Sequence, residues 1–290
     1  MERKIGVILP RELIGGREIL ELAKETEKMG FDYVVACDHV VLPSQNQTGE
    51  KLKYSLEEKY TDPLTLLAAI AAVTGKIELF TGVLVLPERQ TALTARQAAD
   101  VDILSDGRLN LGVGVGWLKE EFDALGMGSI FSQRGRRIER QVELLRQLWT
   151  QDSVNFSDQQ EQFKSVGINP RPIQQPIPIW MGGTNNKVIA RTVRIADGWI
   201  PRGKAAEFNY QYLPLLKQCL EDQARDPQTL PVMGKVNIRW ESGENDWKRE
   251  GDDWLAHSEV SHFSVGSVGG NKSSIDDHLE VLRKAKEYFR

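Results

Sequence analysis

An α/β fold, a single (β/α)8 barrel, is predicted by three features of the sequence. Short apolar runs alternate with segments of helical periodicity along the 290 residues, and such alternation is typical of a parallel sheet. The runs are apolar throughout, as strands covered on both faces are. There are eight of them, the number that closes a TIM barrel. No linker divides the chain, so we expect one domain, residues 1–290, with an open doubly wound sheet as the alternative.

The strands are expected where β-branched and other apolar residues run together. Each run is short and is followed by turn-forming or polar residues, which end it. In chain order the expected strands are residues 4–9, 33–36, 77–86, 108–115, 178–181, 198–201, 232–238 and 260–265.

Helices are expected between the strands, where apolar residues recur at helical spacing. Gly30 ends the first helix, and Asp62 as N-cap with Pro63 at the first helical position begins the second. The expected helices are residues 17–29, 62–73, 91–104, 134–149, 187–195, 208–221 and 274–289. Two polar segments, residues 44–60 and 151–177, are expected as insertions in the loops after the second and fourth strands.

Composition narrows the function classes. The net charge of -4 and a pI near 5.7 give no basic field that would recruit nucleic acid. Cys37 and Cys219 lack metal-ligand or disulfide-framework spacing, so we expect no metal site. No apolar run approaches the length of a membrane-spanning helix, and the one near the N-terminus is too short for a signal peptide. A cytoplasmic enzyme fits these limits, and so does any soluble binding protein.

The site of a (β/α)8 barrel lies at the carboxyl ends of its strands. Asp38 and His39 follow the second expected strand. A histidine there can exchange a proton near neutral pH, although a lone histidine is as often held for structural reasons. Asp38 is either the partner of His39 or a cap for the loop. We therefore expect both as catalytic residues of the site.

Two glycine-rich segments follow other strands. Gly182-Gly183-Thr184 opens onto an expected helix, and free N–H groups at a helix start suit a phosphate; a tight turn is the alternative. Residues 112–116 form a G-x-G-x-G run, which favours either close packing or a flat ligand lying against the strand. Trp117 follows that run directly. Arg136 and Arg137 are further candidates for binding a phosphate or an acidic tail, against the alternative of a solvated basic helix face.

These segments together resemble the bacterial luciferase-like superfamily, most closely its branch of deazaflavin-dependent oxidoreductases. The resemblance covers roughly residues 4–202 and includes several motifs in the family's order. The matching segments are residues 30–32, 38–40, 81–87, 102–109, 112–117, 120–122, 134–137, 178–183 and 196–199.

The resemblance implies a luciferase-like (β/α)8 barrel, often a homodimer, that holds FMN or the deazaflavin coenzyme F420 in the barrel mouth. It implies a non-prolyl cis peptide at Gly82-Val83 behind the cofactor ring. The cofactor phosphate is expected at Gly182, Gly183 and Thr184 and near Val115 and Gly116.

Asp38 and His39 match a pair at the site of a sugar-phosphate dehydrogenase of the superfamily. That enzyme has a glutamate where this chain has Trp117, which argues against the same substrate. Trp117 is instead expected to shape an apolar pocket or to stack on a ligand.

Two chemistries stay open at this point. A reduced-FMN monooxygenase would oxygenate its substrate, whereas an F420-dependent oxidoreductase would transfer a hydride, and either could depend on a separate flavin or F420 reductase. In both, the cofactor carries the reaction and the protein positions it. The alternatives are a non-catalytic flavin-binding relative and a barrel lyase or aldolase, although no barrel-end lysine or metal cluster favours the latter.

Overall fold

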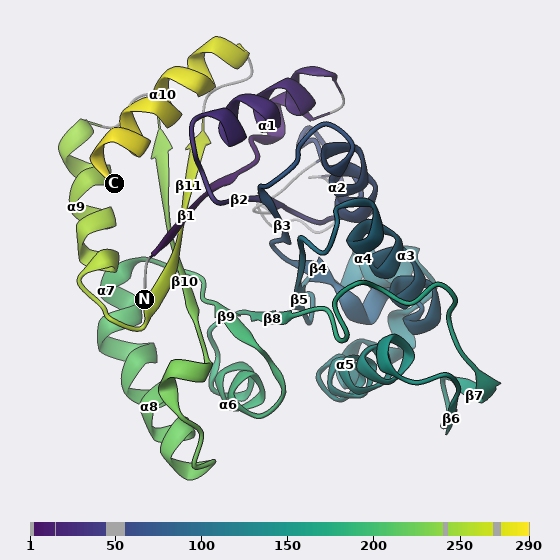
Figure 1. The fold of residues 1–290 in the computed structure, drawn as a ribbon. Coiled ribbons are helices and arrows are strands. Elements are labelled where there is room, and N and C mark those ends of the chain that lie inside the picture. The colour runs from purple at the N-terminus through teal and green to yellow at the C-terminus, as the bar shows by residue number, and fades with distance from the viewer. Residues whose placement is uncertain (1–2, 15, 45–55, 240–242, 269–273, 290) are drawn as a thin grey trace.

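The computed structural model describes residues 3–14, 16–44, 56–239, 243–268 and 274–289. Its parallel strands close into an eight-stranded barrel, as predicted (Figure 1). Strands that follow one another in the chain are neighbours in the sheet, and pairing of β1 with β11 and of β3 with β5 closes the ring. The barrel strands are β1 (Lys4–Ile8), β2 (Tyr33–Ala36), β3 (Glu78–Thr81) with its continuation β4 (Leu84–Val85), β5 (Leu109–Gly114), β8 (Ile179–Gly182), β9 (Gly198–Ile200), β10 (Val232–Arg239) and β11 (Val260–Val268).

Helices surround the strands on the outside of the barrel (Figure 1). The predicted start of the second helix is confirmed, because the Asp62 side chain accepts a hydrogen bond from the Thr65 N–H and Pro63 is the first helical residue. The longer helices are α1 (Glu18–Lys28), α2 (Pro63–Ala71), α3 (Thr91–Leu104), α5 (Arg134–Thr150), α6 (Asn186–Ile195), α8 (Leu213–Asp222), α9 (Glu244–Leu255) and α10 (Ile275–Tyr288), and two short ones are α4 (Lys119–Ala124) and α7 (Ala205–Glu207).

The structure corrects three expectations. The third strand is broken after Thr81 and resumes as β4, whereas one unbroken strand was expected. The segment 151–177, expected to be irregular, holds the antiparallel hairpin β6 (Val154–Ser157) and β7 (Gln162–Val166). Helix α9 was not among the expected helices. Residues 45–55 of the other expected insertion lie outside the described residues.

The barrel interior has its own small core. Inward-facing residues of neighbouring strands pack together there: Tyr33, Val35, Phe80, Trp180, Ile200 and Met233. The rings of Phe80 and Trp180 meet with centroids 5.3 Å apart, and the His262 ring lies 4.8 Å from that of Trp180. Burial lowers the pKa of His262 to about 4, so this ring is neutral at pH 7. This layer fills the inside of the barrel and leaves space at the carboxyl ends of the strands.

Candidate active site

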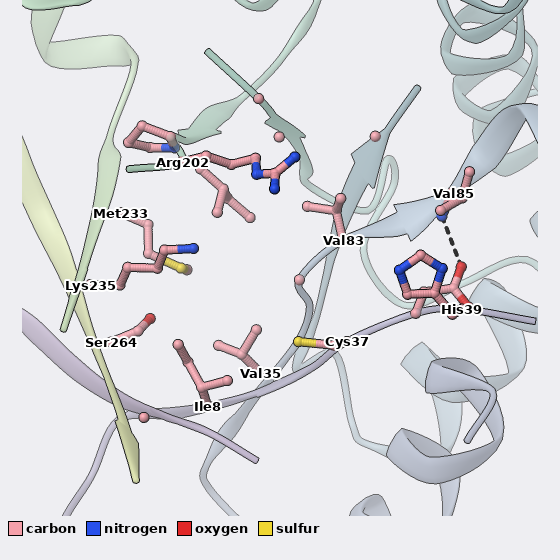
Figure 2. Close-up of a pocket in the computed structure, with 18 of the residues that line it drawn as sticks. Ile8, Val35, Cys37, His39, Val83, Val85, Arg202, Met233, Lys235 and Ser264 are labelled. Atoms are coloured by element: carbon pink, nitrogen blue, oxygen red, sulfur yellow. Dashed lines mark hydrogen bonds between the residues drawn. The ribbon is translucent and has the colours of Figure 1, made fainter. Parts of the chain in front are cut away.

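A cavity of about 520 Å³ opens at the carboxyl ends of the barrel strands, a size typical of cofactor and ligand sites. Ile8, Val35 and Met233 give it an apolar floor (Figure 2). Ile200 also lines the cavity. The residues predicted as catalytic or as contacts of the cofactor ring and phosphate, apart from the two candidate arginines, all line this cavity: Asp38, His39, Gly82, Val83, Val115, Gly116, Trp117, Gly182, Gly183 and Thr184. The structure therefore brings these residues together, and the role of each stays a prediction.

The peptide bond between Gly82 and Val83 is cis, as the resemblance predicted. Val83 points into the cavity (Figure 2) and lies between two strands that carry glycine at the point of contact. A Cβ atom on Gly114 would come within 2.6 Å of the Val83 side chain, and one on Gly182 within 2.7 Å. Of the two interpretations of residues 112–116, the structure therefore supports close packing.

Asp38 is held by its neighbours rather than directed at a ligand. One carboxylate oxygen accepts a hydrogen bond from the Val85 N–H at 2.8 Å, and the other binds the Arg89 guanidinium at 2.9 Å. Arg89 also binds Asp62 at 2.8 Å. Burial raises the pKa of Asp38 against the opposing charge of Arg89. Asp38 thus links β4 to the end of β2. Among the described residues its hydrogen bonds go to Val85 and Arg89, so of the two alternatives for Asp38 the pairing with His39 is not supported.

The partner of His39 is Glu121 of α4. Their Nδ1 and Oε2 atoms lie 2.9 Å apart, and the Glu121 side chain is fully buried. Its other oxygen accepts hydrogen bonds from the backbone N–H groups of Val40 and Val41. A carboxylate on Nδ1 favours the tautomer that carries its proton there, which leaves Nε2 as an acceptor.

Sequence reasoning missed Glu121 because an acidic residue in the first turn of a helix is ordinarily explained by the helix dipole. Its burial next to the buried Phe122 is what distinguishes it. Tyr60 and Trp117 meet the His39 ring edge-on, with centroids 4.9 and 6.2 Å away. The histidine is therefore held by a carboxylate on one side and by aromatic rings on others.

Glu88 is a second buried carboxyl group beside this cluster. Within the described residues, neither of its side-chain oxygens has a hydrogen-bond partner. Burial, with the nearby charges of Glu121 and Asp38, raises the pKa of Glu88 to about 9. Glu88 is therefore protonated and uncharged at neutral pH.

Replacing Glu88 with glutamine is expected to stabilise the protein more at pH 8 than at pH 5. The folded carboxyl has a pKa of about 9 and the unfolded one a pKa near 4.5. Between these values the folded state holds more protons, so the free energy of unfolding falls as pH rises. Glutamine keeps the shape and removes this dependence. The Tm of the Glu88→Gln variant and of the wild type, measured at both pH values, tests this prediction, with the variant of the exposed Glu221, Glu221→Gln, as control. An equal change in Tm at pH 5 and pH 8 would contradict the prediction.

The β8 end of the cavity leads into α6 through Gly182, Gly183 and Thr184. Asn185 caps the helix by accepting a hydrogen bond from the Val188 N–H at 2.9 Å. Gly183 has a φ of 119°, a backbone conformation that favours glycine. The Trp199 indole N–H donates to its carbonyl oxygen at 2.8 Å. This turn therefore has a firmly held backbone and a capped helix start.

A second cavity of about 680 Å³ adjoins the first, and we call it the basic chamber. Val115, Arg134, Asn185 and Val188 line both cavities. Four of the residues that line the chamber are cationic, and they come from α5 and α6: Arg134, Arg136, Lys187 and Arg191.

The cations of the chamber differ in their surroundings. Arg191 is bound to Glu139 at 2.8 Å, and Arg134 donates to backbone oxygens of Gly116 and Phe131. Arg136 and Lys187 are exposed.

Arg137, also considered for phosphate, turns away from the chamber. Its guanidinium donates to the carbonyl oxygens of Pro87 and Arg89, and the residue is buried. Of the two arginines considered from the sequence, Arg136 alone lines the chamber. In the parts of the chain that the structure describes, no group of three or more His, Cys, Asp or Glu side chains is arranged to hold a metal ion.

The family model for luciferase-like monooxygenases matches residues 4–280. The chain belongs to this family. An F420-dependent glucose-6-phosphate dehydrogenase of Amycolatopsis mediterranei is 30% identical over 99% of this luciferase-like chain and 84% of the relative. An FMNH(2)-dependent dimethylsulfone monooxygenase of Pseudomonas putida is 29% identical over 64% of the chain and 49% of the relative. An uncharacterised Mycobacterium tuberculosis protein is 31% identical to this chain. The chain spans 65% of that relative's length, just under two thirds.

Solved structures share the fold of this luciferase-like chain. An F420-dependent secondary alcohol dehydrogenase with an F420–acetone adduct has a TM-score of 0.79 at 15% identity, covering all of both chains. The F420-dependent tetrahydromethanopterin reductase of Methanopyrus kandleri has a TM-score of 0.72 at 18% identity, covering 98% of both. Both cofactors expected from the sequence, F420 and FMN, thus occur in the relatives' names. In the described part of the chain, no helix has the length and apolar character needed to span a bilayer.

Proposed function

We propose that this luciferase-like protein is an F420-dependent oxidoreductase acting on a carbon that bears a hydroxyl or carbonyl group of a small molecule. The observation that carries the choice of cofactor is the basic chamber, which continues the main cavity beyond the expected phosphate position at Gly182, Gly183 and Thr184. The F420-dependent relatives that match nearly the whole chain support the same choice.

The main cavity suits a flat ring. Its floor is apolar, and Val83 rises into it from the cis peptide between two glycine positions. The held turn at Gly183 and the start of α6 offer backbone N–H groups to a phosphate. The residues present therefore fit a flavin-type cofactor with its ring over Val83 and its phosphate toward α6.

The chain's own residues supply positioning and a proton path. When bound, F420 accepts or donates a hydride. His39, with Nδ1 held by Glu121 at 2.9 Å, accepts the hydroxyl proton of an alcohol at Nε2, or returns it in the reverse direction. Tyr60 and Trp117 contact the ring of His39 edge-on and so help to fix its position.

The basic chamber distinguishes the two cofactors. FMN ends in one phosphate, whereas F420 continues beyond its phosphate into a tail that carries several carboxylates. Arg136 and Lys187 lie along the extension of the cavity that such a tail would follow. FMN would leave the chamber empty. A homodimer and a separate cofactor reductase stay predictions from the resemblance, and a cytoplasmic location stays a prediction from the composition.

The double variant Arg136→Gln/Lys187→Gln is expected to weaken F420 binding about tenfold, since the loss of two exposed charge contacts amounts to roughly 1.4 kcal/mol. FMN affinity should change less than twofold. Fluorescence titrations with both cofactors measure this, with Lys284→Gln, a residue of α10 outside both cavities, as the control. Equal F420 affinity in the double variant and the wild type would contradict the proposal.

Turnover separates an enzyme from a non-catalytic flavin-binding relative. With F420 bound, the wild type is expected to reduce it in the presence of an alcohol from a panel that includes 2-propanol and glucose 6-phosphate, compounds related to those in the relatives' names. Tight binding of F420 without reduction by any member of a broad panel of alcohols would favour the non-catalytic alternative.

A further inference from the structure

The backbone that carries His39 is held by a segment that runs from the end of β4 almost to α3. We call residues 85–89 the bracing segment. It supplies two groups that bind the Asp38 carboxylate, the Val85 N–H at one end and the Arg89 guanidinium at the other. Because Asp38 directly precedes His39, a shift of the bracing segment would also move the histidine.

Glu88 lies inside the bracing segment and does nothing to fix it in place. Burial and the nearby charges of Glu121 and Asp38 raise the pKa of its carboxyl group. In the described part of the chain neither carboxyl oxygen has a hydrogen-bond partner. An uncharged buried group without a partner costs free energy and exerts no hold on its own backbone. Other contacts must therefore keep this part of the segment in position.

Arg137 of α5 holds the backbone on both sides of Glu88. Its Nε donates to the Pro87 carbonyl oxygen at 3.0 Å, and its Nη2 donates to the Arg89 carbonyl oxygen at 3.1 Å. Its Nη1 donates to Gln160 Oε1 at 2.7 Å. The guanidinium is a rigid planar fork, so these three acceptors are fixed relative to one another. Arg137 lies outside both cavities.

The third acceptor, Gln160, belongs to the turn of the β6–β7 hairpin, which is firmly held. Asp158 Oδ1 accepts hydrogen bonds from the N–H groups of Gln160 and Glu161 at 2.7 and 2.8 Å. Glu161 in turn accepts one from the Thr91 N–H at the start of α3, at 3.2 Å. Figure 1 shows the hairpin at the outer edge of the molecule. Arg137 therefore ties a peripheral turn to the segment beside the site.

We propose that Arg137 is a positioning residue of the active site. It fastens the bracing segment to the hairpin turn, and through Asp38 it keeps His39 in the orientation that proton transfer needs. The role of His39 in this inference rests on the proposed function. A change at Arg137 should slow the chemical step and leave cofactor binding intact, because Arg137 acts from outside both cavities.

Arg137→Lys keeps the charge and loses the fork that reaches three acceptors. It is expected to lower kcat for F420 reduction about tenfold, as misplaced reacting groups do, with KM and F420 affinity changed less than about twofold. The matched control is Arg108→Lys. Arg108 also donates to backbone carbonyl oxygens, those of Ala71, Thr74 and Ile77, but it precedes β5, at the end of the barrel opposite the cavity. Its loss should lower Tm and leave kcat unchanged.

The ring ¹⁵N signals of His39 give a second readout that needs no cofactor. The chain has four histidines, and His39→Asn identifies the signals that belong to His39. In Arg137→Lys these signals should move from those of the Nδ1-protonated tautomer toward a mixture of tautomers, whereas Arg108→Lys should keep them. A purely structural role of Arg137 would lower Tm and leave the His39 signals of the folded protein unchanged.

Unchanged His39 signals in Arg137→Lys would overturn the inference, and so would equal changes in Arg108→Lys or a loss of F420 affinity in place of kcat. A wild type that does not bind F420 would refute the proposed function, while the His39 signals would still test the positioning by Arg137. If Arg137→Lys does not fold, Gln160→Ala replaces it, with its exposed neighbour Gln159→Ala as control. Changed His39 signals in the Gln160 variant alone would support the inference, and equal signals in both would overturn it.

Discussion

Replacing His39 with asparagine is expected to lower kcat for F420 reduction by about 10²–10⁴-fold, the usual contribution of a positioned proton acceptor. F420 affinity should change less than threefold, because the ring of the cofactor is assigned to Val83 and its phosphate to the α6 side. The assay follows F420 reduction by any alcohol of the panel that the wild type oxidises. Circular dichroism verifies that the variant is folded.

Glu121→Gln is the companion variant for this prediction. Glutamine removes the carboxylate charge and has one oxygen where Glu121 uses two, so it cannot accept from His39 Nδ1 and from the Val40 and Val41 N–H groups at once. We expect kcat to fall about tenfold, less than on loss of the imidazole itself. Unchanged kcat in the His39 variant would remove His39 from the reaction, and an equal loss of F420 affinity and of kcat would assign it to cofactor binding instead.

Replacing Gly112 with alanine is expected to lower the free energy of unfolding by about 3 kcal/mol or more, at the upper end for overpacked positions. A Cβ atom there would lie 2.0 Å from the carbonyl oxygen of Thr81. The Thr81 oxygen belongs to the backbone and the Cβ is fixed to the backbone through Cα, so neither can rotate away at this junction of β3 and β5. There the Thr81 hydroxyl also donates a hydrogen bond to the Gly112 carbonyl oxygen at 2.6 Å. The clash is relieved only by separating the two strands that close the barrel.

Gly75→Ala is the control, since a Cβ atom on Gly75 meets nothing within 4 Å. Urea unfolding of the two variants measures the difference. If Gly112→Ala does not accumulate as folded protein while Gly75→Ala does, the prediction holds in its strongest form. Stabilities within about 0.5 kcal/mol of each other would contradict the packing account of residues 112–116.

The sequence was sufficient for the barrel and for the place of the site, because both depend on local patterns. Apolar runs gave the strands, and the barrel rule placed the site at their carboxyl ends. Asp38, His39 and the turn at Gly182 were found in this way, since each directly follows or ends a strand. The cis peptide at Gly82-Val83 came from the resemblance alone, because no local pattern distinguishes it.

What the sequence did not reveal depends on contacts between distant segments. Glu121 and His39 are 82 positions apart, as their hydrogen bond shows, and the partner of Asp38 is 51 positions away. Lys235 of β10 also lines the main cavity, and it was missed because one charged residue in an apolar run is easily taken for a strand end. The available signal was its spacing: Lys235 stands two residues after Met233, which points inward, and alternate residues of a strand face the same side.

Helix α9 was overlooked for a different reason. Its sequence is strongly charged, so its apolar content is low for a barrel helix. Trp247 and Trp254, seven positions apart, nevertheless lie on one buried face together with Gly251. That spacing is helical, and two large aromatic side chains bury enough surface to hold the helix against the barrel.

The central claim is that the two adjoining cavities hold coenzyme F420. Parallel fluorescence titrations of the purified wild-type chain with F420 and with FMN, each oxidised and reduced, test it most directly. The account predicts that F420 binds at least tenfold more tightly than FMN in both redox states, because the basic chamber contributes to F420 alone. Tighter binding of FMN, or binding of neither, would contradict it.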